Sequence, residues 1–108
     1  MNKLLKKPRN DKLYEAILSL NTVEECKQFL EDLCSISELM AMEQRYQVAS
    51  CLYKGMIYND ILAETGASSA TISRVNRSLQ YGKGGYELVF NRVGKRKSEQ
   101  LRFPRRLV

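Results

Sequence analysis

Hydrophobic residues recur along this chain three or four positions apart, the spacing of one helix face. Between 11 and 20 they are Leu13, Ile17, Leu18 and Leu20, and between 23 and 34 they are Val23, Cys26, Phe29, Leu30, Leu33 and Cys34. Each pattern predicts an amphipathic helix. Thr22 and Glu25 have the spacing of a capping box, so the second helix should begin directly after Thr22.

A third and longer helix is expected from Glu38 to Lys54, preceded by Ser35 or Ser37 and ended by Gly55. Its apolar positions are Leu39, Met40, Ala41, Met42, Tyr46, Val48, Ala49, Cys51, Leu52 and Tyr53. This face is broader than one small monomer needs for its own core. Sharing of the face with a second copy of the chain is therefore expected.

Two shorter helices are expected at 58–65 and from Ser68 (or Ser69) to about Leu79, with Gly66 between them. Their inward positions are Ile61, Leu62, Ile72, Val75 and Leu79. This pattern suits two helices that cross at a steep angle, and it predicts a helix-turn-helix over 58–79.

A glycine-rich hinge at 81–85 and a short sixth helix at 86–93 complete the pattern. The alternation expected of strands is absent, so the predicted fold is all-α with about six helices. No stretch of the sequence is apolar enough to span a membrane, and no signal peptide is recognisable. We therefore expect a cytoplasmic protein.

The net charge of +6 is concentrated at the two ends of the chain. Residues 1–12 carry +4 and residues 95–108 carry +5, so the part between them is mildly acidic. The expected organisation is a basic N-terminal arm at 1–10, a helical domain at 11–93 and a basic tail at 94–108. These ends are either solvated tails or arms that contact the phosphate backbone of a nucleic acid such as DNA, the kind of partner that clustered positive charge favours.

Catalysis is not expected from this composition. The chain has no histidine, no glycine-rich phosphate loop and no carboxylate pair in an obvious concave setting. Its three cysteines lack paired spacing and resemble reduced, mostly buried thiols. We accordingly predict neither an enzyme nor a metal or other cofactor.

The helix expected to begin near Ser68 has a tip of small side chains, and residues 67–73 contain no acid. Its outward positions are Ser69, Ala70, Ser73, Asn76 and Arg77, with Thr71 near the boundary. Such a tip can enter the major groove of B-DNA. The favoured hypothesis is a DNA-binding regulator with double-stranded DNA as its partner. The alternative is a helical protein-interaction module that does not bind specific DNA.

From residue 10 to 93 the chain resembles the Trp repressor superfamily, in particular its Trp-repressor-related bacterial branch. The matching elements are Leu33-Cys34-Ser35 before Glu38, Arg45, Gly55, and Gly66-Ala67 with Ala70-Thr71-Ile72-Ser73-Arg74. The resemblance implies six helices in an intertwined homodimer, and a repressor that recognises a palindromic operator. Groove contacts are implied for Ser69, Ala70, Thr71 and Ser73. Asn59, Ser68 and Arg77 are further candidate DNA contacts.

In the Trp repressor a co-repressor amino acid is held at positions that match Ser35, Arg45 and Arg74. The alternative role for the two arginines is salt bridging. Tryptophan-binding members carry glycine where this chain has Val75, and the added isopropyl group would occupy the space of the indole ring. The resemblance therefore implies a possible effector site, but not one for tryptophan.

Overall fold

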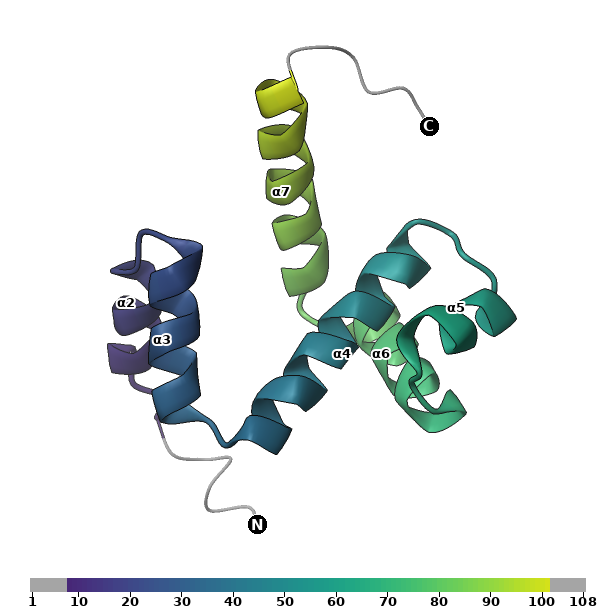
Figure 1. Cartoon of the computed structure of the whole chain (residues 1–108), viewed down its shortest axis with the longest axis horizontal. Coiled ribbons are helices and arrows are strands. Elements are labelled where there is room, and N and C mark those ends of the chain that lie inside the picture. Colours follow the sequence, from purple (N-terminus) through teal and green to yellow (C-terminus); the bar gives the residue numbers. More distant parts are fainter. Residues whose placement is uncertain (1–7, 102–108) are drawn as a thin grey trace. The chain divides into compact units, whose positions relative to one another are not determined.

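The computed structural model describes residues 8–101, and the side chains of residues 8–94. Within this range the chain forms six helices and no strand, which confirms the predicted all-α fold. The helices are α2 (Lys12–Leu18), α3 (Val23–Leu33), α4 (Ile36–Tyr53), α5 (Tyr58–Thr65), α6 (Ser69–Tyr81) and α7 (Gly85–Leu101) (Figure 1). The chain divides into two compact units, Met1–Leu39 and Met40–Val108.

The predicted capping box at the start of α3 is confirmed. The backbone N–H of Glu25 donates to Oγ1 of Thr22 at 3.0 Å. The carboxylate of Glu25 accepts in return from the backbone N–H of Asn21 at 2.8 Å, one residue earlier than in the usual box. The first bond satisfies a backbone donor that the first turn of a helix leaves unpaired, and the second satisfies the N–H of the residue before the cap.

Helix α4 begins at Ile36, two residues earlier than its apolar pattern predicts. Ser35 rather than Ser37 precedes it, because the N–H of Glu38 donates to Oγ of Ser35 at 3.2 Å. The N–H of Ser35 donates to the Glu38 carboxylate at 2.8 Å. This second capping box explains why the helix begins before the first residue of its apolar face.

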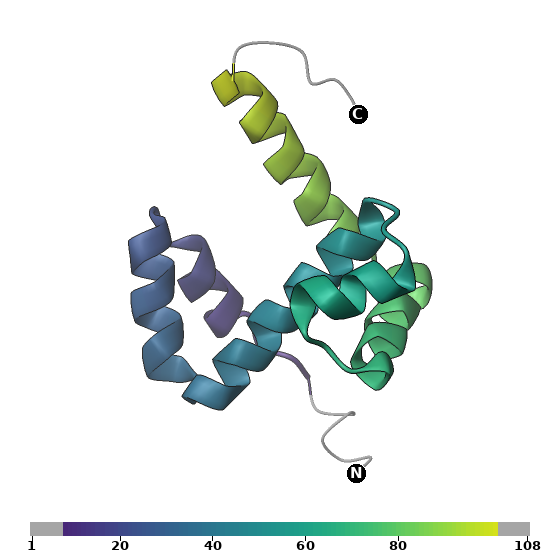
Figure 2. The same ribbon diagram turned by 45° about the vertical axis from the view of Figure 1, so that its right-hand side comes forward.

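In the first unit, α2 and α3 lie side by side (Figures 1 and 2). None of the described residues 8–39 is buried. Leu18 is 83% exposed, and Val23 and Ile36 are each 65% exposed. Cys26 is exposed and Cys34 half-buried, so the expectation of mostly buried thiols is wrong except for Cys51. The two helices of this unit therefore leave a large apolar surface uncovered.

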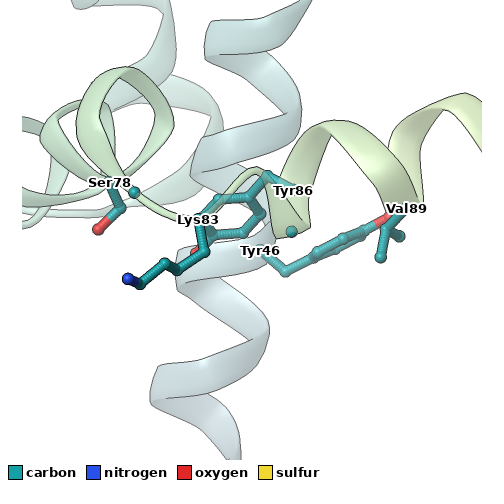
Figure 3. Close-up of a pocket in the computed structure, with 7 residues that line it drawn as sticks. Tyr46, Ser78, Lys83, Tyr86 and Val89 are labelled. Atoms are coloured by element: carbon teal, nitrogen blue, oxygen red, sulfur yellow. The ribbon is translucent and has the colours of Figure 1, made fainter.

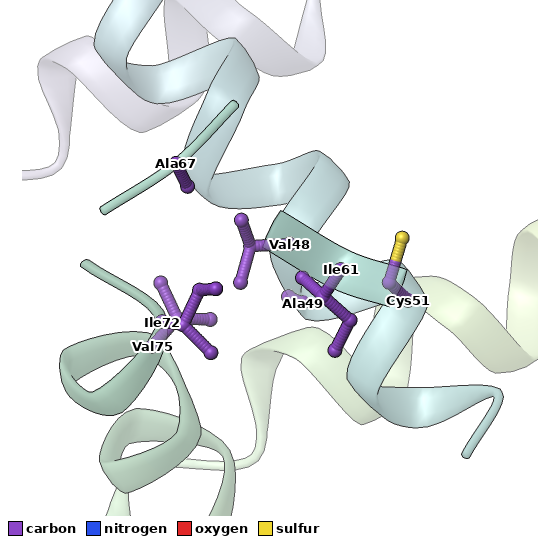
Figure 4. Packing of buried hydrophobic residues seen from close by; sticks show 7 residues of the cluster. All are labelled: Val48, Ala49, Cys51, Ile61, Ala67, Ile72 and Val75. Atoms are coloured by element: carbon purple, nitrogen blue, oxygen red, sulfur yellow. The ribbon is translucent and has the colours of Figure 1, made fainter. Parts of the chain in front are cut away.

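The second unit has a compact hydrophobic core (Figure 4). Its buried members are Val48, Ala49 and Cys51 from α4, Ile61 from α5, Ala67 from the turn, and Ile72 and Val75 from α6. The inward positions predicted for α5 and α6 thus agree with the packing. Burial of an aliphatic side chain of this size contributes about 1.5–3 kcal/mol. The helix-turn-helix is therefore held against α4 by its apolar face.

Helix α7 runs from Gly85 to Leu101, eight residues beyond the predicted end at Val93. Its anchor on α4 is aromatic: the ring centroid of Phe90 lies 4.8 Å from that of Tyr53 and 5.4 Å from that of Tyr46. The segment after Val93 has few apolar residues and so no helical pattern to detect, but its lysines, arginines, glutamate and glutamine are good helix formers. None of the described helices is long and apolar enough to cross a membrane.

Candidate nucleic-acid interface

The turn between α5 and α6 is fixed by backbone conformation and by hydrogen bonds. Gly66 has φ +69°, a left-handed conformation that residues with a Cβ rarely adopt. The hydroxyl of Thr65 donates to the carbonyl of Ile61 at 2.7 Å and accepts from the N–H of Ala67 at 3.1 Å. The Gln44 side chain donates to the Thr65 carbonyl at 3.2 Å. Because Gln44 belongs to α4, this bond connects the turn to the core helix.

Ser68 is the N-cap of α6. Its Oγ accepts from the N–H of Thr71 at 3.1 Å and donates to Oγ1 of Thr71, also at 3.1 Å. The first turn of α6 contains no acidic residue. The positive end of the helix dipole is therefore not neutralised by the helix itself, which favours the approach of an anion such as phosphate. The described bonds give Ser68 a capping role, and its DNA contact stays a prediction.

The structure places most predicted DNA contacts on the surface. Ser69, Ala70, Ser73 and Arg77 are exposed on α6, and Thr71 is half-buried. Three of these residues, Ala70, Ser73 and Arg77, line one hollow of about 440 Å³ together with Arg74. Asn59 is exposed in the first turn of α5 and is not part of this hollow. The hollow therefore combines two small side chains with two guanidinium groups.

Tyr58 is a residue of this region that the sequence analysis missed. It is the first residue of α5, and its hydroxyl donates to the carbonyl of Ser69 at 3.0 Å. The same hydroxyl lies 3.1 Å from Oγ of Ser73. Helix periodicity cannot reveal such a contact, because the partners lie 11 and 15 residues away on another helix. The only available signal was an aromatic residue with a polar end at the start of the unit.

The three residues implied as effector ligands are divided between the two units, and their joint role stays a prediction. Ser35 belongs to the first unit, where it caps α4, whereas Arg45 and Arg74 belong to the second. Among the described residues no hydrogen bond joins any two of the three. Arg74 instead lines the hollow on α6. Val75 is 2% exposed and packs in the core, so its isopropyl group fills space inside the unit.

A second hollow, of about 600 Å³, lies between α4 and the junction of α6 with α7 (Figure 3). It is lined by Tyr46, Ser78, Gly82, Lys83, Gly85, Tyr86 and Val89. This hollow shares no residue with the implied effector set. No group of three or more His, Cys, Asp or Glu residues in the described part of the chain could hold a metal ion.

The chain is similar to known proteins in both sequence and structure. The sequence model of the family described as Trp repressor protein matches residues 9–94. The chain is 48% identical over 89 residues to the uncharacterized protein YerC of Bacillus subtilis (strain 168), covering 82% of this chain and 86% of YerC.

Two solved structures share the fold. A TrpR-like protein from Eubacterium eligens ATCC 27750 has a TM-score of 0.78 and 50% identity, covering 87% of this chain and 96% of that one. A structure from Staphylococcus aureus also has a TM-score of 0.78, with 44% identity over 85% of this chain and 92% of its own. The helix order and the helix-turn-helix therefore recur in close relatives.

Proposed function

The chain belongs to the Trp repressor protein family, and from this membership we propose that it is a sequence-specific DNA-binding transcriptional repressor. The observation that carries the proposal is the exposed start of α6, where short side chains and an acid-free first turn stand on a rigid core. A helix tip of this kind can lie close to base edges in the major groove. It would do so without a charged or bulky side chain between the helix and the DNA.

The side chains of this tip suit two kinds of contact. The methyl group of Ala70 and the hydroxyls of Thr71 and Ser73 are suited to base edges, including the methyl group of thymine. Arg74 and Arg77 are suited to phosphate oxygens, and each such contact would release counterions from the duplex. We assign Asn59, at the start of α5, to the adjacent backbone.

We propose that the regulator acts as a homodimer with a palindromic operator. The described residues 8–39 bury none of their apolar side chains, and Met40 and Met42 of α4 are also exposed. Exposed apolar side chains in such number are typical of an interface between chains. Two-fold symmetry would then present two copies of α6 to half-sites about one helical turn apart.

We propose further that tryptophan is not the effector. Val75 fills buried space beside Arg74, so an indole ring could enter only by displacing a packed side chain, at a cost of about 1–3 kcal/mol or more. Isothermal calorimetry should detect no tryptophan binding at micromolar concentrations, with or without operator DNA. Micromolar affinity would contradict this proposal.

The proposed function is tested by selecting bound duplexes from a random pool. The expected product is a two-fold motif with fixed half-site spacing, whose affinity falls steeply between low and physiological salt. An affinity that is insensitive to salt and to sequence would support an interaction module instead.

Ala70→Glu tests the position of α6 within this function. A carboxylate at the exposed tip would face the phosphates, and it should lower operator affinity at least tenfold. Ala63→Glu is the matched control, because it adds the same side chain to an exposed alanine of α5. A melting temperature of Ala70→Glu at or above that of the wild type would show that the variant is folded. Retention of full affinity by this variant would contradict the assignment of α6 to the groove.

A further inference from the structure

The hydrogen bonds around Tyr58 restrict what the hydroxyl of Ser73 can offer to DNA. A backbone carbonyl only accepts hydrogen bonds, so the single hydrogen of the Tyr58 phenol is donated to the Ser69 carbonyl, 3.0 Å away. The phenol oxygen can then only accept from Ser73, whose Oγ lies 3.1 Å from it. The hydrogen of Ser73 is thereby directed to the phenol oxygen of Tyr58.

This arrangement leaves Ser73 with lone pairs alone on its exposed side. Ser73 is exposed and lines the hollow on α6 together with Ala70 and Arg77. A group that only accepts cannot bond to a phosphate oxygen, nor to N7 or O6 of guanine or O4 of thymine, because these are also acceptors. The donors available in the major groove are the exocyclic amines, N6 of adenine and N4 of cytosine.

We propose that Tyr58 is a specificity-determining residue that fixes Ser73 as an acceptor for an exocyclic base amine. The inference rests on the proposed function, since it concerns how α6 recognises its operator. Tyr58 acts through Ser73 and is a positioning residue, because it joins the first residue of α5 to the second turn of α6. Thr71 has the opposite polarity: its Oγ1 accepts from Ser68, and its own hydrogen stays available to base acceptors.

The test pairs protein variants with modified bases in the selected operator. Ser73→Ala identifies the base pair that Ser73 contacts. At that pair, N6-methyladenine or N4-methylcytosine removes the amine hydrogen from the groove, and a 7-deazapurine removes N7. In the wild-type protein, methylation should weaken binding about three- to tenfold, the effect of one neutral hydrogen bond, and the 7-deaza base should have little effect. Ser73→Ala should make the affinity insensitive to that methylation.

Tyr58→Phe should release the hydrogen of Ser73 and reduce the selectivity for the amine. Its sensitivity to methylation should fall, and sensitivity to 7-deaza substitution should appear at the same pair only. Tyr81→Phe is the matched control, because it removes a phenol hydroxyl from the exposed far end of α6 and should behave as the wild type. Equal melting temperatures of the two variants would show that both are folded.

Two results would overturn the inference and leave the proposed function intact. One is coupling of Ser73 to N7 and not to the amine in the wild-type protein. The other is a Tyr58→Phe variant whose base sensitivities equal those of the wild type. Failure of the wild-type chain to select any operator would instead refute the proposed function, and the inference would fall with it.

Discussion

Hydroxyl-bearing residues at the start of α6 have different roles although they lie within six positions. Ser68 uses both its hydrogen and a lone pair on Thr71, so it stabilises the first turn. Thr71 keeps a hydrogen, and Ser73 keeps only lone pairs beside Tyr58. Small polar residues that look interchangeable in the sequence therefore become chemically distinct through their neighbours.

Another single residue, Glu38, is expected to titrate at a lower pH than an ordinary glutamate. Hydrogen bonds to its carboxylate, first from the backbone N–H of Ser35 and then from the Ser35 hydroxyl, lower its pKa below the usual 4.5. Because the pKa is lower in the folded chain than in the unfolded chain, the carboxylate stabilises the fold above about pH 4.5. This stabilisation is lost as the pH falls through the lowered value. Titration followed by NMR of the side-chain carboxyl carbon measures the shift directly.

Ser35→Ala separates the two causes. It removes the hydroxyl but keeps the backbone N–H, which is the larger cause, so the pKa of Glu38 should return only part of the way towards 4.5. A wild-type pKa of 4.5 or above would contradict the capping box at the start of α4. Glu38→Gln should abolish the acid-dependent loss of stability that this group causes.

Among the elements, the turn between α5 and α6 depends on Gly66. A Cβ at this position would meet no atom within 4 Å, but the φ of +69° is itself unfavourable for alanine. Gly66→Ala should therefore lower the free energy of unfolding by about 1–2 kcal/mol. Gly94→Ala is the matched control: Gly94 lies within α7 with open space around it, so its replacement should raise stability by about 0.5–1 kcal/mol. Urea unfolding of both variants measures the difference, and equal effects would contradict the strained turn.

The positions of helices were predictable where a capping residue marks the end of a helix, or where apolar residues recur with the period of one helix face. Thr22, Ser68 and Gly66 each locate a boundary that the structure confirms. The extent of α7 was not predictable, because its last turns follow Gly94 and carry no apolar period. The start of α4 was placed two residues late because its cap precedes the apolar face.

The candidate site was predictable in part. Exposure of Ser69, Ala70, Ser73 and Arg77 follows from helix periodicity once Ile72 and Val75 are assigned to the core. The hydrogen bonds of Tyr58 depend on the angle at which α5 and α6 cross, and this angle cannot be predicted from the spacing of residues in the sequence. The place of Arg74 in the same hollow as Ser73 follows from spacing, because the hollow is lined by positions 70, 73, 74 and 77 of one helix face.

The exposed apolar residues of the first unit allow self-association of the whole molecule to be tested by mutation. Leu18 is 83% exposed at the end of α2 and should be covered in the proposed dimer. Leu18→Glu should raise the dimer dissociation constant about tenfold or more, since it places a charge in an apolar interface. Sedimentation equilibrium measures the change. Ser19→Glu puts the same charge one position later, on an exposed residue, and should affect association less. A wild-type chain that stays monomeric at high concentration would refute the dimer.

The exposed apolar side chains of residues 8–39 would make operator occupancy by such a regulator depend steeply on the concentration of the chain. In the proposed dimer these side chains would be covered by the second chain, so folding of this segment and pairing of chains would become one event. At low expression, occupancy of an operator would then rise with the square of the number of chains. A modest change in synthesis or degradation would switch the controlled genes more sharply than a monomeric binder could.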